Sequence, residues 1–191
     1  MDWFPNYNII LASKSPRRQQ LLKSLGLTFI VKIREVEEIF PEDLSKEEVP
    51  VYLARLKATP FKNELSETDL LITADTVVCL NDEILGKPSD YNEAFQMLQS
   101  LSDKVHEVIT GVCLTSKIKQ DSFFAKSKVE FKSLTKDEID YYIRTFKPFD
   151  KAGAYGIQEW IGAIGITNIE GSFYNVMGLP IQKLYEKIQS F

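Results

Sequence analysis

A continuous apolar run crosses the middle of the chain, Leu70-Leu71-Ile72-Thr73-Ala74, and resumes after Asp75-Thr76 as Val77-Val78-Cys79-Leu80. An uninterrupted run of this kind is typical of a strand buried on both faces of a sheet. Further strand-like segments at 9–11, 28–33, 105–118, 123–131 and 160–169 are interspersed with helical patterns that begin near residues 16, 45, 93, 135 and 180. We therefore expect an α/β fold with an elongated, mixed, twisted sheet, flanking helices and a central cleft. Residues 1–191 are expected to form a single domain, with two lobes around the cleft left open.

Composition excludes several classes of protein. The chain has 191 residues, of which 44% are hydrophobic and 26% charged, which is typical of a globular protein rather than a disordered one. Its formal net charge of −4 argues against broad nucleic-acid binding but permits a small anionic ligand held by a few cations. No stretch reaches the ~18 apolar residues of a membrane span. Residues 1–6 lack the features of a signal peptide, and Cys79 and Cys113 lie in apolar runs without metal-site spacing, so a cytoplasmic protein with two buried thiols is expected.

The segment Leu11-Ala12-Ser13-Lys14-Ser15-Pro16-Arg17-Arg18 predicts a strand, a tight polar turn and a helix. Ser15 is placed as the N-cap and Pro16 as the first helical residue. The turn then directs backbone N–H groups and the positive end of the helix dipole at one point. Two arginines in the first turn oppose that dipole, which favours a phosphate site, although a solvated helix face explains them equally well.

Asp75 is the best candidate for a catalytic carboxylate, because it is expected at the end of a buried strand, although aspartate is also common at a turn. Glu37 and Glu38 are adjacent, so they point to opposite faces of an extended chain and at most one can join Asp75. Lys57 and Lys87 are isolated cations, of which Lys87 is held between Gly86 and Pro88.

Other kinds of catalysis find no support in the sequence. His106 is the single histidine and is interpreted as a structural residue, so a Ser-His-Asp or Cys-His mechanism has no basis. A Walker A motif and a GxGxxG motif are both absent from the sequence. Carboxylates, arginines and lysines remain, and these suit metal-assisted attack of water on a phosphate ester or anhydride.

The opening segment, followed by Leu21-Leu22, resembles the signature of the Maf family of nucleotide pyrophosphatases. Further motifs follow in the family's order and extend the resemblance over nearly the whole chain. They are Glu37-Glu38, Lys57-Ala58, Ala74-Asp75-Thr76-Val77-Val78, Leu85-Gly86-Lys87-Pro88, His106-Glu107-Val108-Ile109-Thr110-Gly111-Val112, Asp150-Lys151-Ala152-Gly153-Ala154-Tyr155-Gly156-Ile157-Gln158 and Gly171-Ser172-Phe173-Tyr174-Asn175-Val176-Met177-Gly178-Leu179-Pro180.

The resemblance implies a house-cleaning enzyme with an ITPase-like fold that hydrolyses a nucleoside triphosphate between its α and β phosphates. The motif at 154–158 resembles the branch that acts on dTTP and UTP. Pyrophosphatases for 7-methyl-GTP or another modified nucleotide, and a nucleotide-sensing inhibitor of septum formation, are the alternatives. The implied partner is the nucleotide substrate, without nucleic acid or membrane, and a homodimer is left open.

The resemblance also implies a role for each matched site residue. Asp75 would activate water, and Glu38 and Asp75 would hold a divalent cation, Mg²⁺ or Mn²⁺. The triphosphate would be bound by Ser13, Arg17, Arg18, Lys57 and Lys87, and the base would be selected by Arg17, Thr76 and Gln158.

The chain departs from the family pattern in two places. Glu159 and Trp160 follow Gln158 where many relatives have a small residue, and they are expected at the rim of the pocket, where they would alter base preference. Pro60 interrupts a helix that is usually rich in alanine, and we expect it to affect packing only.

The amide of Gln158 offers a donor and an acceptor, which complement the N–H and carbonyl groups of uracil and thymine.

Overall fold

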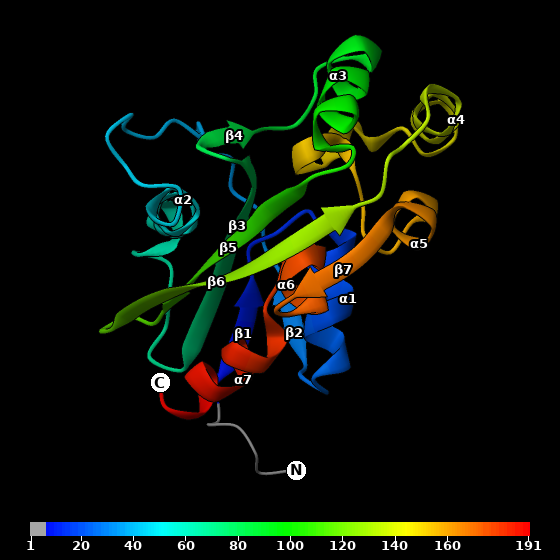
Figure 1. Cartoon of the computed structure of the whole chain (residues 1–191). Helices are drawn as coiled ribbons and strands as arrows, with labels where there is room; N and C mark the ends of the chain where they lie inside the picture. Colours follow the sequence, from blue (N-terminus) through cyan, green and yellow to red (C-terminus); the bar gives the residue numbers. More distant parts are fainter. Residues whose placement is uncertain (1–6) are drawn as a thin grey trace. The chain divides into compact units, whose positions relative to one another are not determined.

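The computed structural model describes residues 7–191, which contain one mixed sheet of seven strands (Figure 1). The strand order is β2-β1-β3-β5-β6-β7, and β4 pairs with β3. β1 is parallel to both β2 and β3, whereas β4 and β7 are antiparallel to β3 and β6. The predicted α/β class with a mixed sheet is therefore confirmed. The strands are β1 Asn8–Leu11, β2 Phe29–Val31, β3 Asp69–Leu80, β4 Glu83–Leu85, β5 Val105–Thr115, β6 Gln120–Phe131 and β7 Ile166–Glu170.

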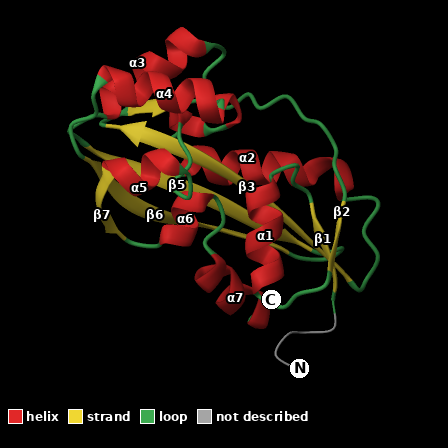
Figure 2. Cartoon of the chain, turned by 90° about the vertical axis from the view of Figure 1, so that its right-hand side faces the viewer, coloured by secondary structure: helices red, strands yellow, loops and turns green. Residues whose placement is uncertain are grey.

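Helices connect most of these strands (Figure 2). The predicted N-cap at Ser15 is confirmed, because its Oγ accepts a hydrogen bond from Arg18 N at 3.4 Å. Thr135 and Glu138 form a reciprocal capping box at the start of α4. The α-helices are α1 Pro16–Ser24, α2 Glu48–Ala58, α3 Tyr91–Leu101, α4 Lys136–Phe146, α5 Trp160–Gly165, α6 Phe173–Met177 and α7 Ile181–Gln189, and the 3-10 helices are η1 Thr59–Phe61, η2 Pro148–Asp150 and η3 Ala152–Ala154.

The chain divides into two compact units. The first contains residues 7–75, Thr110–Ala125 and Gly178–Phe191, and the second contains Thr76–Ile109 and Lys126–Met177. Strands β3, β5 and β6 contribute residues to both units.

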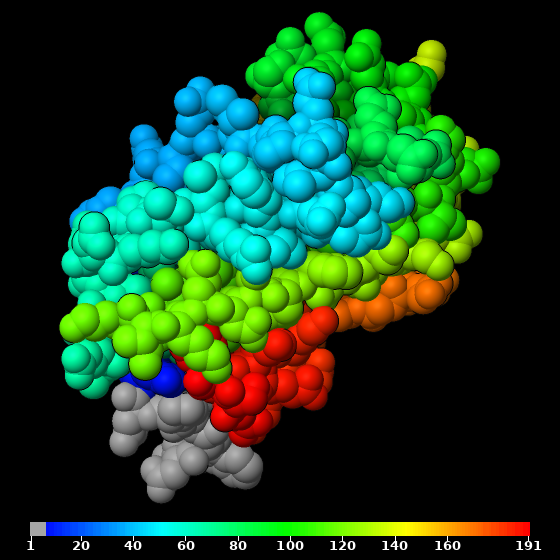
Figure 3. Space-filling model, turned by 90° about the vertical axis from the view of Figure 1, so that its left-hand side faces the viewer, coloured from blue at the N-terminus to red at the C-terminus, as the bar shows by residue number. Residues whose placement is uncertain are grey.

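In the first unit, α2 packs against the sheet through buried residues that include Ala54, Ala58 and Leu71. The tip of the β5–β6 hairpin, yellow-green in Figure 3, lies beside the cyan α2 region and the red C-terminal helix. Two polar contacts hold it there, from Arg55 Nε to Ser122 Oγ at 2.7 Å and from Lys183 Nζ to the carbonyl of Phe124 at 2.9 Å. The hairpin tip thus supports α2, the helix that carries Lys57.

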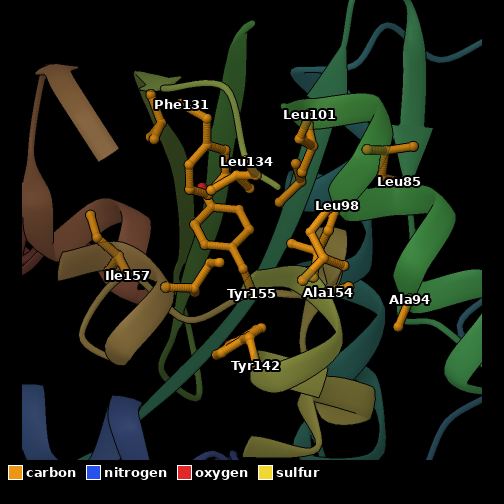
Figure 4. Packing of buried hydrophobic residues seen from close by; sticks show 14 of the residues in the cluster. Leu85, Ala94, Leu98, Leu101, Phe131, Leu134, Tyr142, Ala154, Tyr155 and Ile157 are labelled. Carbon is orange, nitrogen blue, oxygen red and sulfur yellow. The ribbon is translucent and has the colours of Figure 1, made fainter. Parts of the chain in front are cut away.

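The second unit has its own apolar core, shown in Figure 4. Leu98 and Leu101 of α3, Phe131 of β6 and Tyr142 of α4 are almost completely buried and surround the ring of Tyr155. His106 is buried among them, and its Nε2 lies 2.7 Å from Tyr155 Oη. The interpretation of His106 as a structural residue agrees with this position.

The prediction of a strand over 160–169 is wrong for its first half, where α5 forms, and only Ile166–Glu170 is extended. The helix lets Gly162 lie directly against Ile157, since an added Cβ would come within 1.9 Å of the Ile157 carbonyl oxygen. Ile161 of the same helix is buried in the core of the second unit, and Gly165 lies against Phe131 and Leu134, so tertiary packing overrides the strand propensity of the isoleucines in this segment.

The expectations about cellular location are tested only in part. Cys79 and Cys113 are buried thiols, as predicted. Within residues 7–191, the structure contains no helix whose length and apolar character would allow it to cross a membrane. The expectation for residues 1–6 lies outside the described residues.

Candidate functional site

The turn after β1 leads directly into a helix N-terminus. Ser13 is buried, and its Oγ accepts a hydrogen bond from Ser15 N at 3.2 Å, so the turn closes on itself. Within the described residues the Ser13 hydroxyl donates no hydrogen bond, so its proton remains available to a ligand.

The register between β1 and β3 brings this turn beside Asp75. Leu11 pairs with Ile72, and the N–H of Ala12 donates to the Ile72 carbonyl at 3.0 Å, after which β1 ends while β3 continues. Asp75 therefore lies in the middle of β3, and the prediction that it ends a strand is wrong. The edge of β3 beside Asp75 is open on this side because the neighbouring strand, β1, ends at Leu11.

Arg18 extends from α1 toward the same part of β3. Its Nη1 donates to the Ala74 carbonyl and its Nε to the Gly178 carbonyl, each at 2.8 Å. Burial lowers the pKa of the Arg18 guanidinium, and the nearby Asp75 carboxylate opposes that shift. Arg18 thus joins α1, β3 and the segment before α7, and it places a cation close to Asp75.

The packing of α2 on β3 determines which side chain meets Asp75. Thr73 Oγ1 donates to the Ala54 carbonyl at 2.6 Å, which fixes α2 over this strand. Asp75 is two residues after Thr73 and so points to the same face of the sheet, and Lys57 is three residues after Ala54 on the same side of the helix. Lys57 Nζ consequently lies 2.6 Å from Asp75 Oδ1.

Glu38 completes a cluster of three charged groups. Its Oε1 lies 3.0 Å from Lys57 Nζ, so a single ammonium group bridges the carboxylates of Glu38 and Asp75. The side chains of Lys57 and Asp75 are 16% and 12% exposed, and that of Glu38 is 43% exposed, so the cluster is open to solvent on the Glu38 side. The side chain of Glu37 forms no ion pair or hydrogen bond within the described residues, which agrees with the expectation that at most one of the two glutamates joins Asp75.

The donor set of this cluster suits a hard divalent cation. Two carboxylates already share one positive group there, which shows that the position accepts a cation. Residues 7–191 contain no group of three or more His, Cys, Asp or Glu side chains arranged to hold a metal ion. Two carboxylates suffice for Mg²⁺, which usually takes its remaining ligands from water and substrate phosphates.

Three further predicted residues, Thr76, Lys87 and Gln158, belong to the second unit. Thr76 follows Asp75 directly in β3. Lys87 and Gln158 lie on two loops joined by a hydrogen bond from Gly153 N to the Gly86 carbonyl at 3.0 Å. Both side chains are exposed, and neither forms an ion pair or hydrogen bond within the described part of the chain.

The structure also reveals a polar network that the sequence did not predict. Lys151 Nζ lies 3.2 Å from Glu159 Oε1, and Tyr142 donates a hydrogen bond to Glu159 Oε2. Lys151 lies within a predicted motif, but nothing in the pattern pairs it with Glu159. A lysine in an otherwise small and apolar segment was the available signal, because a buried cation needs a nearby partner.

Comparison with known proteins identifies the family of this chain. A family model described as Maf-like protein matches residues 8–191. A dTTP/UTP pyrophosphatase of Flavobacterium psychrophilum is 54% identical over 95% of this chain and 93% of its own. One from Phocaeicola vulgatus is 53% identical over 96% of this chain and 95% of its own, and one from Porphyromonas gingivalis is 47% identical over 100% and 98%. With matches of this extent across both units, the chain belongs to the Maf family.

Proposed function

We propose that this chain is a nucleoside triphosphate pyrophosphatase that hydrolyses dTTP and UTP between the α and β phosphates. The observation that carries the proposal is the similarity to three relatives that are 47–54% identical over at least 95% of this chain, each named dTTP/UTP pyrophosphatase. The products are the nucleoside monophosphate and pyrophosphate. The proposed location of the protein is the cytoplasm, where its nucleotide substrates would be found.

Asp75 is proposed to accept the proton of the attacking water. A general base needs an oxygen that is not already occupied, and only Oδ1 of Asp75 is bound, by Lys57 at 2.6 Å. Within residues 7–191, Oδ2 accepts no hydrogen bond and so offers its lone pairs to water. Lys57 holds the carboxylate in place, and the contact from Thr73 to Ala54 keeps Lys57 above it.

The proposed cation ligands are Glu38 and Asp75, for either Mg²⁺ or Mn²⁺. Such a cation neutralises charge on phosphate oxygens and lowers the pKa of bound water when it is present. Binding would require Lys57 to release at least one carboxylate, after which its ammonium group is available to the phosphates. Lys57 thus serves as the counterion of the carboxylates in the absence of nucleotide.

The triphosphate is proposed to bind Ser13, Arg17, Arg18, Lys57 and Lys87. The Ser13 hydroxyl, the first turn of α1 and the cations supply donors for phosphate oxygens. Gln158, with Arg17 and Thr76, is proposed to select the base. Its exposed amide, which makes no hydrogen bond within residues 7–191, is free to pair with a uracil or thymine edge.

A substrate panel tests the proposal. Purified protein is incubated with dTTP, UTP, CTP and 7-methyl-GTP, with Mg²⁺, Mn²⁺ or EDTA, and the phosphorus products are separated. We expect pyrophosphate and monophosphate from dTTP and UTP, and no turnover in EDTA. Release of inorganic phosphate with a diphosphate contradicts α–β cleavage, and preferred turnover of 7-methyl-GTP contradicts the substrate assignment. Tight nucleotide binding without turnover in any metal contradicts the enzyme assignment and favours a nucleotide sensor.

A further inference from the structure

The loop that carries Gln158 is closed by a largely buried polar network. Lys151 stands at its start and Glu159 at its end, and their side chains are 8% and 19% exposed with Nζ and Oε1 3.2 Å apart. Tyr142 of α4 donates its hydroxyl hydrogen to Glu159 Oε2 and accepts one from Gly156 N at 3.0 Å. Glu159 therefore links both ends of the loop, and through Tyr142 also its middle, to α4.

The backbone of this loop requires such support. Gly153 and Ala154 have φ values of +67° and +60°, and the left-handed region is unfavourable for alanine. Gly156 lies directly over the ion pair, since an added Cβ would lie 2.8 Å from Glu159 Cδ and 3.1 Å from Lys151 Cε. The loop thus follows a strained path with its backbone against the ion pair.

Glu159 is also an unusual residue for its place in the backbone. It is the N-cap of α5, but its side chain makes no capping hydrogen bond. Ser, Thr, Asp or Asn would cap this helix better, so the choice of glutamate is explained by its contacts with Lys151 and Tyr142. Burial and the hydrogen bond to Glu159 raise the pKa of Tyr142, which favours the protonated form of the hydroxyl that donates to Glu159.

We infer that Glu159 is a positioning residue for base selection, which acts with Lys151 and Tyr142 to hold Gln158 in one orientation. Gln158 precedes Glu159 directly, is exposed, and has no hydrogen bond of its own within the described residues, so the backbone path that the network holds on either side of it sets the direction in which its amide leaves the loop. Glu159 faces into the loop toward Lys151 and Tyr142, and its effect on the base is indirect. This inference rests on the proposed function, because it concerns the selectivity of the same site.

The test replaces Glu159 by glutamine, which keeps the size of the side chain and removes its charge. We expect kcat/KM for dTTP to fall roughly tenfold more than kcat/KM for CTP, mainly through a higher KM, because the base loses an oriented amide. The matched control is Glu170→Gln, which removes an ion pair of the same length, 3.2 Å, between Glu170 and Lys128. The side chains of this pair are 71% and 47% exposed, respectively. This control is expected to leave both nucleotides unaffected.

A double-mutant cycle separates positioning from general support of the fold. If Glu159 acts through Gln158, then Glu159→Gln has little further effect on dTTP-over-CTP selectivity once Gln158→Ala is present. An equal effect in both backgrounds, or an equal loss for every nucleotide, overturns the inference. In the single variant Lys151 keeps one partner, Asp150, whose Oδ1 lies 2.7 Å away and whose side chain is 61% exposed. The variant Lys151→Met/Glu159→Gln removes both charges of the buried pair, which controls for poor folding of the single variant. The same loss of selectivity is expected from it.

Hydrogen exchange distinguishes failure of the inference from failure of the proposed function. In nucleotide-free protein, Glu159→Gln should accelerate exchange of the Gly156 amide, which donates to Tyr142, and Glu170→Gln should not. Unchanged exchange at Gly156 overturns the inference whether or not the protein is an enzyme. Wild-type protein that releases no pyrophosphate overturns the proposed function instead, and the role of Glu159 in base selection falls with it, even where exchange at Gly156 does change.

Discussion

Lys57 decides the electrostatic balance of the candidate site, because its single ammonium group is shared by Glu38 and Asp75. Lys57 and Asp75 are both largely buried, so solvent screens their attraction less than that of an exposed pair. Without Lys57 the two carboxylates would lose the ammonium group that bridges them, and the Arg18 guanidinium would remain as a nearby cation. Two effects can therefore be measured separately: that of Asp75 on turnover, and that of the Lys57–Asp75 ion pair on stability.

Replacement of Asp75 by asparagine should abolish most activity while the fold survives. Asparagine keeps the shape of the side chain and its Oδ1 acceptor for Lys57, but it cannot take a proton from water. We expect turnover of dTTP to fall by at least ~10²–10⁴-fold, as is typical when a general base is removed. Steady-state kinetics with a circular dichroism control measures this. Turnover close to that of the wild type would move the role of base to Glu38.

Replacement of Lys57 by methionine should destabilise the protein by about 1–3 kcal/mol, because it leaves a buried acceptor unpaired. Most of that loss should disappear in the Asp75→Asn background, where the charge that needs compensation is gone. Urea unfolding of the four proteins in the cycle measures the coupling. The same loss in both backgrounds would mean that the ion pair does not contribute to stability.

Residues of the cluster differ in how far sequence alone could identify them. Asp75 stands out because a charged residue interrupts a buried apolar run. Lys57 and Glu38 lie in an ordinary helix and an ordinary loop, so the residues alone made them weak candidates and only the family resemblance gave them roles. The contact between Lys151 and Glu159 depends on a loop path with two successive left-handed residues, and local patterns do not determine such a path.

Among the helices and strands, those with caps or long apolar runs were predicted well. Ser15 and Thr135 begin α1 and α4 as expected, and the run at 70–80 is extended as expected, although β3 continues through Asp75, where a strand end was predicted. The segment at 160–169 was misjudged because its isoleucines favour a strand, whereas α5 forms there, with Ile161 buried in the core of the second unit and Gly165 against Phe131 and Leu134. Long-range packing is the information that a local pattern lacks.

The close packing of α2 on β5 gives a prediction about a single methyl group. A Cβ at Gly111 would lie 2.3 Å from the carbonyl carbon and oxygen of Pro50 in α2, and these backbone atoms cannot rotate away. Gly111→Ala should therefore cost about 1–3 kcal/mol or more and should also lower turnover, because α2 carries Lys57. Gly86→Ala is the control for stability, since nothing lies within 4 Å of its Cβ position. Equal urea midpoints for the two variants would contradict the observed packing.

For the protein considered in full, composition and element order were sufficient to predict the α/β class with a mixed sheet, which the structure confirms. The division into two compact units was left open, because strands β3, β5 and β6 run through both and no change in composition marks a boundary. Net charge excluded broad nucleic-acid binding but could not select a substrate. Under the proposed function that choice depends on a few side chains, such as that of Gln158 in a loop, and composition does not determine their positions.

The single histidine gives a prediction for the stability of the folded protein against pH. Burial lowers the pKa of His106 to about 4, whereas the ordinary value in an unfolded chain is about 6.5. Between these values the unfolded state binds a proton that the folded state does not, so stability is complete above pH 6.5 and is lost as the pH falls toward 4. The free energy of unfolding should decrease by about 2 kcal/mol between pH 7 and pH 5. Urea unfolding at pH 7, 6 and 5 measures the slope, and His106→Gln, which can still hydrogen bond to Tyr155, should remove most of it. A slope that persists in this variant would assign the proton uptake to other groups.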